Sequence, residues 1–198
     1  MNTLALLGTV FGLAFSAGLN LYATVLVTGL ALRFDWVSVP PSLSSLETLG
    51  HPVVLGAAAI LYAVEFLADK IPAVDHVWDA AHGVIRPAGA AWIAWRAAGG
   101  SGLSEPAEVA LLLAAGGIAL TTHATKATTR VAVGATGGHA LGLGVALSLV
   151  EDVVAFILSP LALLIPILVL LFVLLVLAFG GWAVWRLARR RRARRAAA

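Results

Sequence analysis

The longest uncharged stretch of the chain is the feature that most restricts its fold. No charged residue occurs between Asp152 and Arg186, and the stretch is rich in leucine, valine and isoleucine. Because about 20 apolar residues in a helix span the hydrocarbon layer of a bilayer, it predicts membrane-spanning helices. The whole chain is 61% hydrophobic and 12% charged, whereas soluble proteins have roughly 25% charged residues. The sequence therefore predicts an all-α integral membrane protein.

Apolar stretches separated by turn sequences divide residues 1–185 into a single membrane domain of about six transmembrane helices. The N-terminal stretch has no basic region before it and is too long for a signal peptide, so we expect a retained helix. Residues 72–98 fit either a spanning helix or an interfacial helix followed by a short span. We expect breaks at SAGLN in the first helix, and in the fourth, which turns polar after Thr121.

The two halves of this domain share an order of features. Residues 3–98 place a polar helix centre before Glu65 and a proline, and residues 106–185 do the same before Glu151. Three spans per half would invert the second copy relative to the first. The order therefore predicts two inverted three-helix repeats with broken helices 1 and 4, a plan found in transporters with the site at the repeat interface.

Residues 186–198 form a basic tail. Seven of the thirteen basic residues lie there, and the rest of the chain has six basic against ten acidic residues. Directly after an apolar helix, such a tail predicts a cytoplasmic anchor on anionic lipids rather than a nucleic-acid-binding segment. With six spans both termini are then cytoplasmic, and Trp182 and Trp185 fit an interfacial belt. The small bundle favours a homodimer.

Four carboxylates lie inside or at the ends of the predicted membrane helices: Glu65, Asp69, Glu151 and Asp152. A charge at this depth costs on the order of 3 kcal/mol, so such residues are usually paired or line a path for an ion or proton. We expect these four to bind the ion or proton, with Asn20 and the broken backbone around Gly18 completing the coordination.

Basic side chains supply candidate counter-charges for this site. Lys126, Arg130 and Lys70 lie in or beside the polar membrane segments. The alternative is that these residues, together with Arg86, form ion pairs that only hold the bundle together.

A second, weaker candidate site is a divalent-metal site. Asp75, Asp79 and His82 follow one another at spacings of four and three, which places them on one helix face. Carboxylates with one imidazole suit Ca²⁺, Mg²⁺ or Mn²⁺. Apart from such a bound cation the sequence predicts no cofactor, and the absence of cysteine excludes thiolate sites. No nucleophile elbow, phosphate loop or zinc-protease motif occurs, so we expect no enzyme.

Four stretches resemble a widespread bacterial membrane family that is known only as a domain of unknown function. They are FSAGLNLYATVLVTGL, VEFLADKIPAVDHVWDAAHGVIRPAGA, TKATTRVAV and SLVEDVVAFILSPLALLIP. The resemblance covers nearly the whole chain up to the basic tail. It implies a location in the bacterial inner membrane but no established activity.

A weaker resemblance is to manganese/calcium–proton antiporters, whose repeats each carry a Glu, Gly, Asp, Lys/Arg, Ser/Thr run. Glu65 precedes Asp69 and Lys70 here, but at a spacing of four rather than three. No glycine precedes Asp69, Ile71 replaces the hydroxyl residue, and Glu151 with its neighbour departs further. This resemblance implies a carboxylate-based cation path without naming the ion.

Together these features predict a membrane transporter of a small inorganic cation, coupled to protons. Two alternatives stay open at this point. One is a cation channel in which the same carboxylates form the filter. The other is a non-transporting scaffold or lipid-binding membrane protein in which the carboxylates only pair internally.

Overall fold

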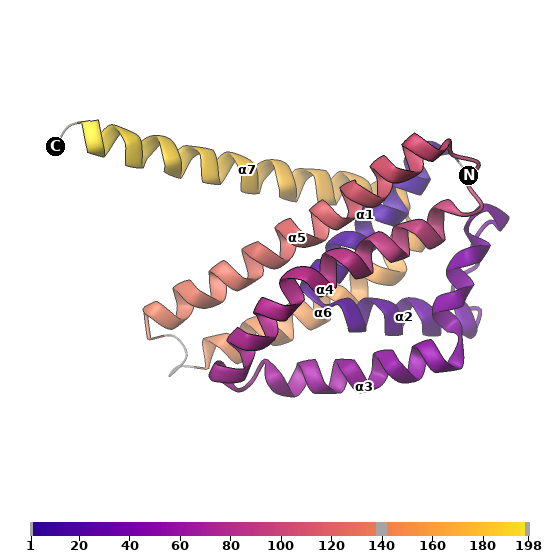
Figure 1. Cartoon of the computed structure of the whole chain (residues 1–198), viewed down its shortest axis with the longest axis horizontal. Helices are drawn as coiled ribbons and strands as arrows, with labels where there is room; N and C mark the ends of the chain where they lie inside the picture. The colour runs from indigo at the N-terminus through magenta and orange to yellow at the C-terminus, as the bar shows by residue number, and fades with distance from the viewer. Residues whose placement is uncertain (1, 138–141, 197–198) are drawn as a thin grey trace.

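The computed structural model describes residues 2–137 and 142–196, and all its regular elements in these ranges are helical (Figure 1). The elements are α1 (Thr3–Leu19), α2 (Leu21–Arg33), the 3₁₀ helix η1 (Pro41–Gly50), α3 (Pro52–Ala68), α4 (Pro72–Ala98), α5 (Glu105–Ala135), α6 (Leu143–Leu164) and α7 (Pro166–Ala196). The prediction of an all-helical chain is confirmed for this part.

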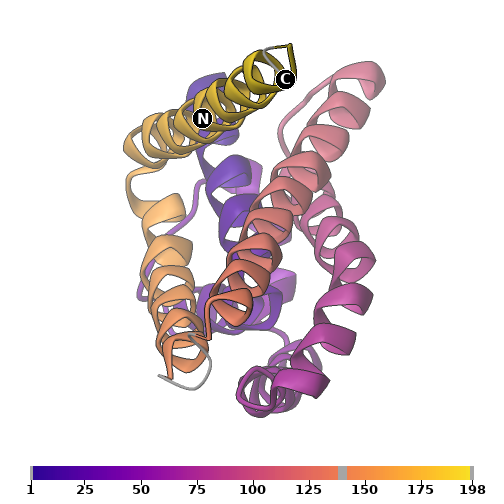
Figure 2. The same cartoon turned by 90° about the vertical axis from the view of Figure 1, so that its left-hand side faces the viewer.

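Helix α1 is the central element of the bundle. It contacts α4, α5, α6 and α7, and Figure 2 shows it between α6 and α7 on one side and α4 and α5 on the other. Helix α7 packs against α1 near its own start, and its C-terminal part extends past the other helices (Figure 1). Helix α1 is therefore enclosed by the other helices on both sides.

The predicted break in the first helix is confirmed, and it falls at Asn20. This residue has extended backbone (φ −152°, ψ 105°), ends α1 and begins α2. Its Oδ1 accepts a hydrogen bond from the backbone N of Ala23 at 2.9 Å. Since an N-cap side chain satisfies a donor that the helix itself leaves free, the buried break is stabilised locally.

The predicted break in the fourth helix is wrong. Helix α5 runs unbroken from Glu105 to Ala135. Its outward threonines donate to carbonyl oxygens four residues earlier, for example Thr121 to Gly117 at 2.8 Å and Thr125 to Thr121 at 2.9 Å. The polar sequence is therefore satisfied inside the helix. The break at Asn20 in the first half therefore has no counterpart in α5, the helix in which an inverted repeat would place it.

Residues 72–98, which fitted two arrangements, form the single helix α4 with Pro87 inside it. The polar segment before α3 contains η1, whose Leu43, Leu46 and Leu49 are all buried. Their spacing of three matches the three residues per turn of a 3₁₀ helix, which puts them on one face. η1 therefore belongs to the core.

Three helices of the described chain are long and apolar enough to cross a membrane: α5, α6 and α7 over Pro166–Arg186. η1 and α3, bent by 59°, add a fourth when taken as one span, and α1 and α2 are shorter apolar helices. Large apolar side chains cover the outside, such as Val53, Ile60 and Leu67 on α3, while charged side chains such as Glu65 and Arg86 are buried. This inverted polarity is consistent with a membrane protein.

The end of α7 joins the aromatic pair to the basic tail. The guanidinium carbon of Arg186 lies 5.1 Å from the ring centre of Trp182, and that of Arg189 lies 4.8 Å from Trp185. Both tryptophans are exposed. The backbone is helical to Ala196, and the side chains of the remaining tail arginines lie outside the described part.

Close packing of α1 on α7 makes a testable prediction at Gly8. A Cβ there would meet the backbone carbonyl group of Pro166, which cannot move aside without shifting a helix. We expect Gly8→Ala to destabilise the fold by about 1–3 kcal/mol, measured by unfolding in detergent. Gly117→Ala on α5, where nothing lies within 4 Å, is the control and should be neutral or slightly stabilising. Equal stability of the two variants would contradict this packing.

Candidate functional site

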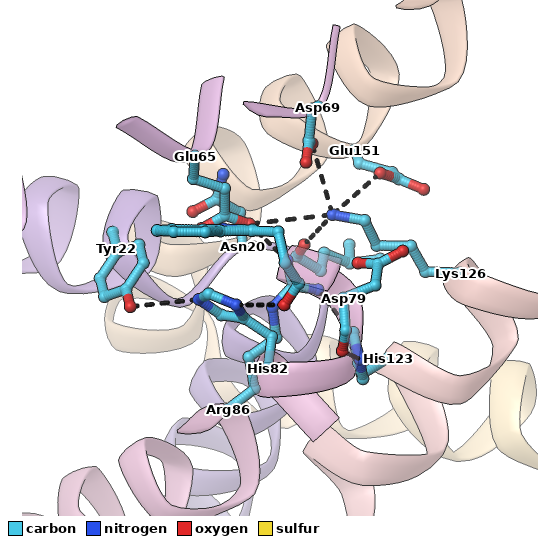
Figure 3. Close-up of polar contacts among 12 residues, drawn as sticks. Asn20, Tyr22, Glu65, Asp69, Asp79, His82, Arg86, His123, Lys126 and Glu151 are labelled. Carbon is cyan, nitrogen blue, oxygen red and sulfur yellow. Dashed lines mark hydrogen bonds and ion pairs between the residues drawn. The ribbon is translucent and has the colours of Figure 1, made fainter. Parts of the chain in front are cut away.

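A network of charged side chains fills the interior where α3, α4, α5 and α6 meet the break between α1 and α2 (Figure 3). All its charged members are buried except Glu151, whose side chain is 13% exposed. The described members are the carboxylates Glu65, Asp69, Asp79, Glu151 and Asp152 and the cations Arg86, Lys126 and Arg130.

Arg86 lies at the centre of the first half of this network. Its Nη2 donates to Oε1 of Glu65, and its Nη1 donates to the carbonyl of Gly18 at 2.8 Å and to Nδ1 of His123 at 2.9 Å. The Nε2 of His123 lies 2.9 Å from the carbonyl oxygen of Asp79. Because a guanidinium only donates and a carbonyl only accepts, His123 is the neutral tautomer with its proton on Nε2.

Arg130 joins carboxylates of two helices. Its Nη2 lies 2.8 Å from Oδ2 of Asp69, the residue that caps α3, and 2.7 Å from Oε2 of Glu151 on α6. The Oγ of Ser148 also donates to Asp69 Oδ2, at 3.0 Å. Charge-assisted bonds of this length are among the strongest in proteins. Arg130 therefore ties α3 and α6 to α5.

Lys126 lies among four oxygens that come from three helices. Its Nζ donates to the carbonyl of Leu19 at 3.1 Å and lies 3.3 Å from Glu151 Oε2, 3.6 Å from Asp69 Oδ2 and 3.9 Å from Glu65 Oε1. We call these four oxygens the Lys126 cage. Figure 3 shows the ammonium group pointing between the carboxylates.

The spacing of the basic residues along α5 and the helix break after α1 together place these side chains around the carboxylates. His123, Lys126 and Arg130 follow one another at intervals of three and four, so they share one helix face. The break leaves the last carbonyls of α1, at Gly18 and Leu19, without partners in their own helix. They carry partial negative charge, and Arg86 and Lys126 donate to them.

Asp152 is the carboxylate with the least compensation. Its Oδ1 accepts from Nδ2 of Asn20 at 2.9 Å, its Oδ2 has no hydrogen bond of normal length although the hydroxyl of Tyr62 lies near the carboxylate, and no lysine or arginine of the described side chains forms an ion pair with it. Hydroxyl groups continue the same seam between α1 and α6: Ser16 Oγ lies 2.8 Å from both Ser159 Oγ and Thr24 Oγ1.

The structure thus brings together all five residues that the sequence predicted as ion or proton ligands, and two of the three predicted counter-charges. The third, Lys70, lies elsewhere: its Nζ is 3.4 Å from the ring centre of Phe66 and has no hydrogen-bond partner among the described residues.

The predicted divalent-metal set of Asp75, Asp79 and His82 stays a prediction, because one of its three side chains lies outside the described part; the described residues themselves contain no group of three or more His, Cys, Asp or Glu side chains arranged to hold a metal ion. The ring nitrogens of His82 lie 2.8 Å from the carbonyl of Trp78 and 3.1 Å from the hydroxyl of Tyr22. Asp79 faces Arg130 instead, with Oδ2 3.9 Å from its Nη1. The side chain of Asp75 lies outside the described part.

Two members of the site, His123 and Ser148, were not predicted from the sequence, and Arg86 was considered there only as a partner in structural ion pairs and not as the central cation. Two spacings pointed to two of these residues. Arg86 lies seven residues after Asp79, and Ser148 four before Asp152, so each shares a helix face with a residue of the network.

One comparison with known proteins identifies the family. The family described as domain of unknown function DUF4126 matches residues 7–186. The chain belongs to this family. The resemblance seen in the sequence is therefore confirmed. No curated protein and no solved structure matches the chain significantly.

The buried pair of Arg86 and Glu65 makes a prediction about stability. Removing one partner leaves an uncompensated charge, so Arg86→Met should cost about 3–5 kcal/mol in detergent unfolding or prevent folding. Adding Glu65→Gln to that variant should recover a large part of the loss. Lys70→Met, which removes a cation outside the network, is the matched control and should cost much less. A mild effect of Arg86→Met alone would show that the pair does not hold the network together.

Proposed function

We propose that the protein is a membrane transporter that exchanges a small inorganic cation for protons through the buried carboxylate network. The observation that carries the proposal is Asp152. A buried carboxylate without a cationic partner is too costly to keep charged and bare in an apolar interior. It therefore holds either a proton or a cation, and holding one excludes the other, which is the chemistry that coupled exchange requires.

The charge balance of the whole network supports the same function. Five carboxylates face three cationic side chains in the described network, a formal excess of two negative charges. If Lys70, which lies outside the network, were also counted, the excess would be one negative charge. Protons or bound cations would balance this excess of negative charge. A network that only held the helices together would not need such an excess.

Unused ligand atoms also support cation binding. One oxygen of each of four buried carboxylates has no hydrogen bond of normal length among the described residues: Glu65 Oε2, Asp69 Oδ1, Asp79 Oδ1 and Asp152 Oδ2. Hard cations are bound by such oxygens. A broken helix beside them offers further backbone groups, as in transporters with discontinuous helices.

The finer membrane arrangement belongs to this proposal. Taking α1 with α2 and η1 with α3 gives six crossings, which return both termini to one side. We place that side in the cytoplasm of a bacterial inner membrane, because the basic tail would then meet anionic lipid. A homodimer would enclose the small bundle further. A carrier fits better than a channel. The arginine and lysine side chains contact the carboxylates inside the bundle, where a channel would need an open path.

A second candidate function is a non-transporting membrane scaffold, and the ion pairs favour it. Glu65, Asp69 and Glu151 each lie within 4 Å of a lysine or arginine, as in a lock between helices. In that case Asp152 would matter for folding alone.

The deciding experiment is ion flux in proteoliposomes of purified protein. Na⁺, K⁺, Mg²⁺, Ca²⁺ and Mn²⁺ are each offered outside, with a pH dye inside. We expect one or more ions to drive proton movement in the native protein and Asp152→Asn to abolish it. This substitution keeps the shape of the side chain and removes its charge.

Asp35→Asn is the matched control, because it makes the same chemical change at an exposed position. Its left-handed backbone (φ 53°) is one that asparagine accepts readily. Flux equal to the native protein is expected. A folded native protein that moves none of the five ions, or an Asp152→Asn variant with undiminished flux, would refute the transport proposal.

A further inference from the structure

The ammonium group of Lys126 is held as a bound ion would be. The four oxygens of the Lys126 cage surround it at 3.1–3.9 Å and come from the end of α1, from α3 with its cap, and from α6. The lysine side chain is 1% exposed, so it is shielded from bulk water. Backbone carbonyl and carboxylate oxygens are the ligands that hard cations prefer.

Lys126 is also the most loosely held cation of the network. Its shortest distance to a carboxylate oxygen is 3.3 Å, whereas Arg130 lies at 2.7 and 2.8 Å from its two carboxylates. Arginine is anchored by a planar fork of donors, but lysine is a point charge on a flexible four-carbon chain. Among these cations Lys126 is therefore the one that can withdraw with least loss.

The charge that Lys126 carries identifies the class of ligand. The cage contains three carboxylates, which Arg86 and Arg130 also contact, and Arg130 faces Asp79 as well. Withdrawal of Lys126 removes one positive charge from the network, and one monovalent cation in its place restores that charge. Glu65 Oε2 and Asp69 Oδ1, both on buried side chains and without hydrogen-bond donors, would complete its coordination.

We propose that the Lys126 cage is a binding site for a monovalent alkali cation, and that the Lys126 ammonium group is a tethered competitor for it. The inference rests on the proposed transport function and adds a second ion position to the one at Asp152. Exchange at the cage is one positive charge for another, so the buried charge of the network stays constant through the cycle.

Cation binding to the purified protein in detergent tests this directly. Thermal unfolding is measured while NaCl or KCl replaces choline chloride at constant ionic strength. Lys126→Gln removes the competitor, so we expect it to bind Na⁺ or K⁺ at least about tenfold more tightly than the native protein, ~1.4 kcal/mol. Lys126→Arg keeps a cation that cannot lose its proton, and we expect it to show no such gain. Equal affinity in Lys126→Gln and the native protein would overturn the proposal.

Two double variants separate this site from the one in the transport proposal. Lys126→Gln with Glu151→Gln removes one cage charge together with the lysine, so the gain in affinity should vanish. Lys126→Gln with Asp152→Asn leaves the cage intact, so the gain should persist even though flux is lost. A gain that disappears only with Asp152→Asn would overturn the cage site while leaving transport at Asp152 standing. Loss of the transport function alone would leave the gain at the cage unchanged.

A measurement on the native chain covers the case in which Lys126→Gln does not fold. Reductive methylation of Lys126, followed by mass spectrometry, reports how accessible its amine is. We expect Na⁺ or K⁺ to increase the modification relative to choline, because a bound ion displaces the side chain from the cage. Methylation that is equal in all three salts would overturn the proposal.

Discussion

Mutual compensation of buried charge is the interaction on which the arrangement of the helices depends. One face of α5 presents Lys126 and Arg130 to carboxylates from α3 and α6, while Arg86 from α4 meets Glu65. In an apolar interior none of these charges is tolerable alone, so the helices that carry them are obliged to pack together. The apolar outer faces of the same helices supply little direction, because lipid tails are as apolar as they are. The polar contacts thus decide which helix faces which.

The break at Asn20 links this network to the centre of the bundle. An unbroken helix would use its own carbonyl groups, but the break frees those of Gly18 and Leu19 for Arg86 and Lys126. The same asparagine caps α2 through Oδ1 and donates to Asp152 through Nδ2. One residue therefore ends a helix, begins the next and orients the carboxylate for which the described side chains provide no ion pair. A network of ion pairs thereby becomes adjacent to a site with unbalanced charge.

Much of this arrangement could be predicted from sequence, because charges in apolar stretches are conspicuous. Asn20 marked the helix break, and the spacing of Glu65 and Asp69 placed both on one face. The continuity of α5 could not be predicted from composition, since threonines that satisfy themselves within a helix look the same as residues that interrupt it. The sequence also could not show which basic residue pairs with which carboxylate. Lys70 is adjacent to Asp69 in sequence, yet its ammonium group lies over the ring of Phe66. Side chains of consecutive helix residues point in different directions.

In the proposed transport cycle, Asp152 alternates between a proton and a cation. Infrared difference spectroscopy on the purified protein measures this most directly, because a protonated carboxyl group has a carbonyl band distinct from that of a carboxylate. The spectrum in choline is compared with the spectrum in the ion that drives flux, for the native protein and for Asp152→Asn. We expect the native protein to lose a protonated carboxyl band when the ion is added, and Asp152→Asn to lack this change. A native spectrum without a protonated carboxyl band in choline, or a band unaffected by the ion, would contradict it.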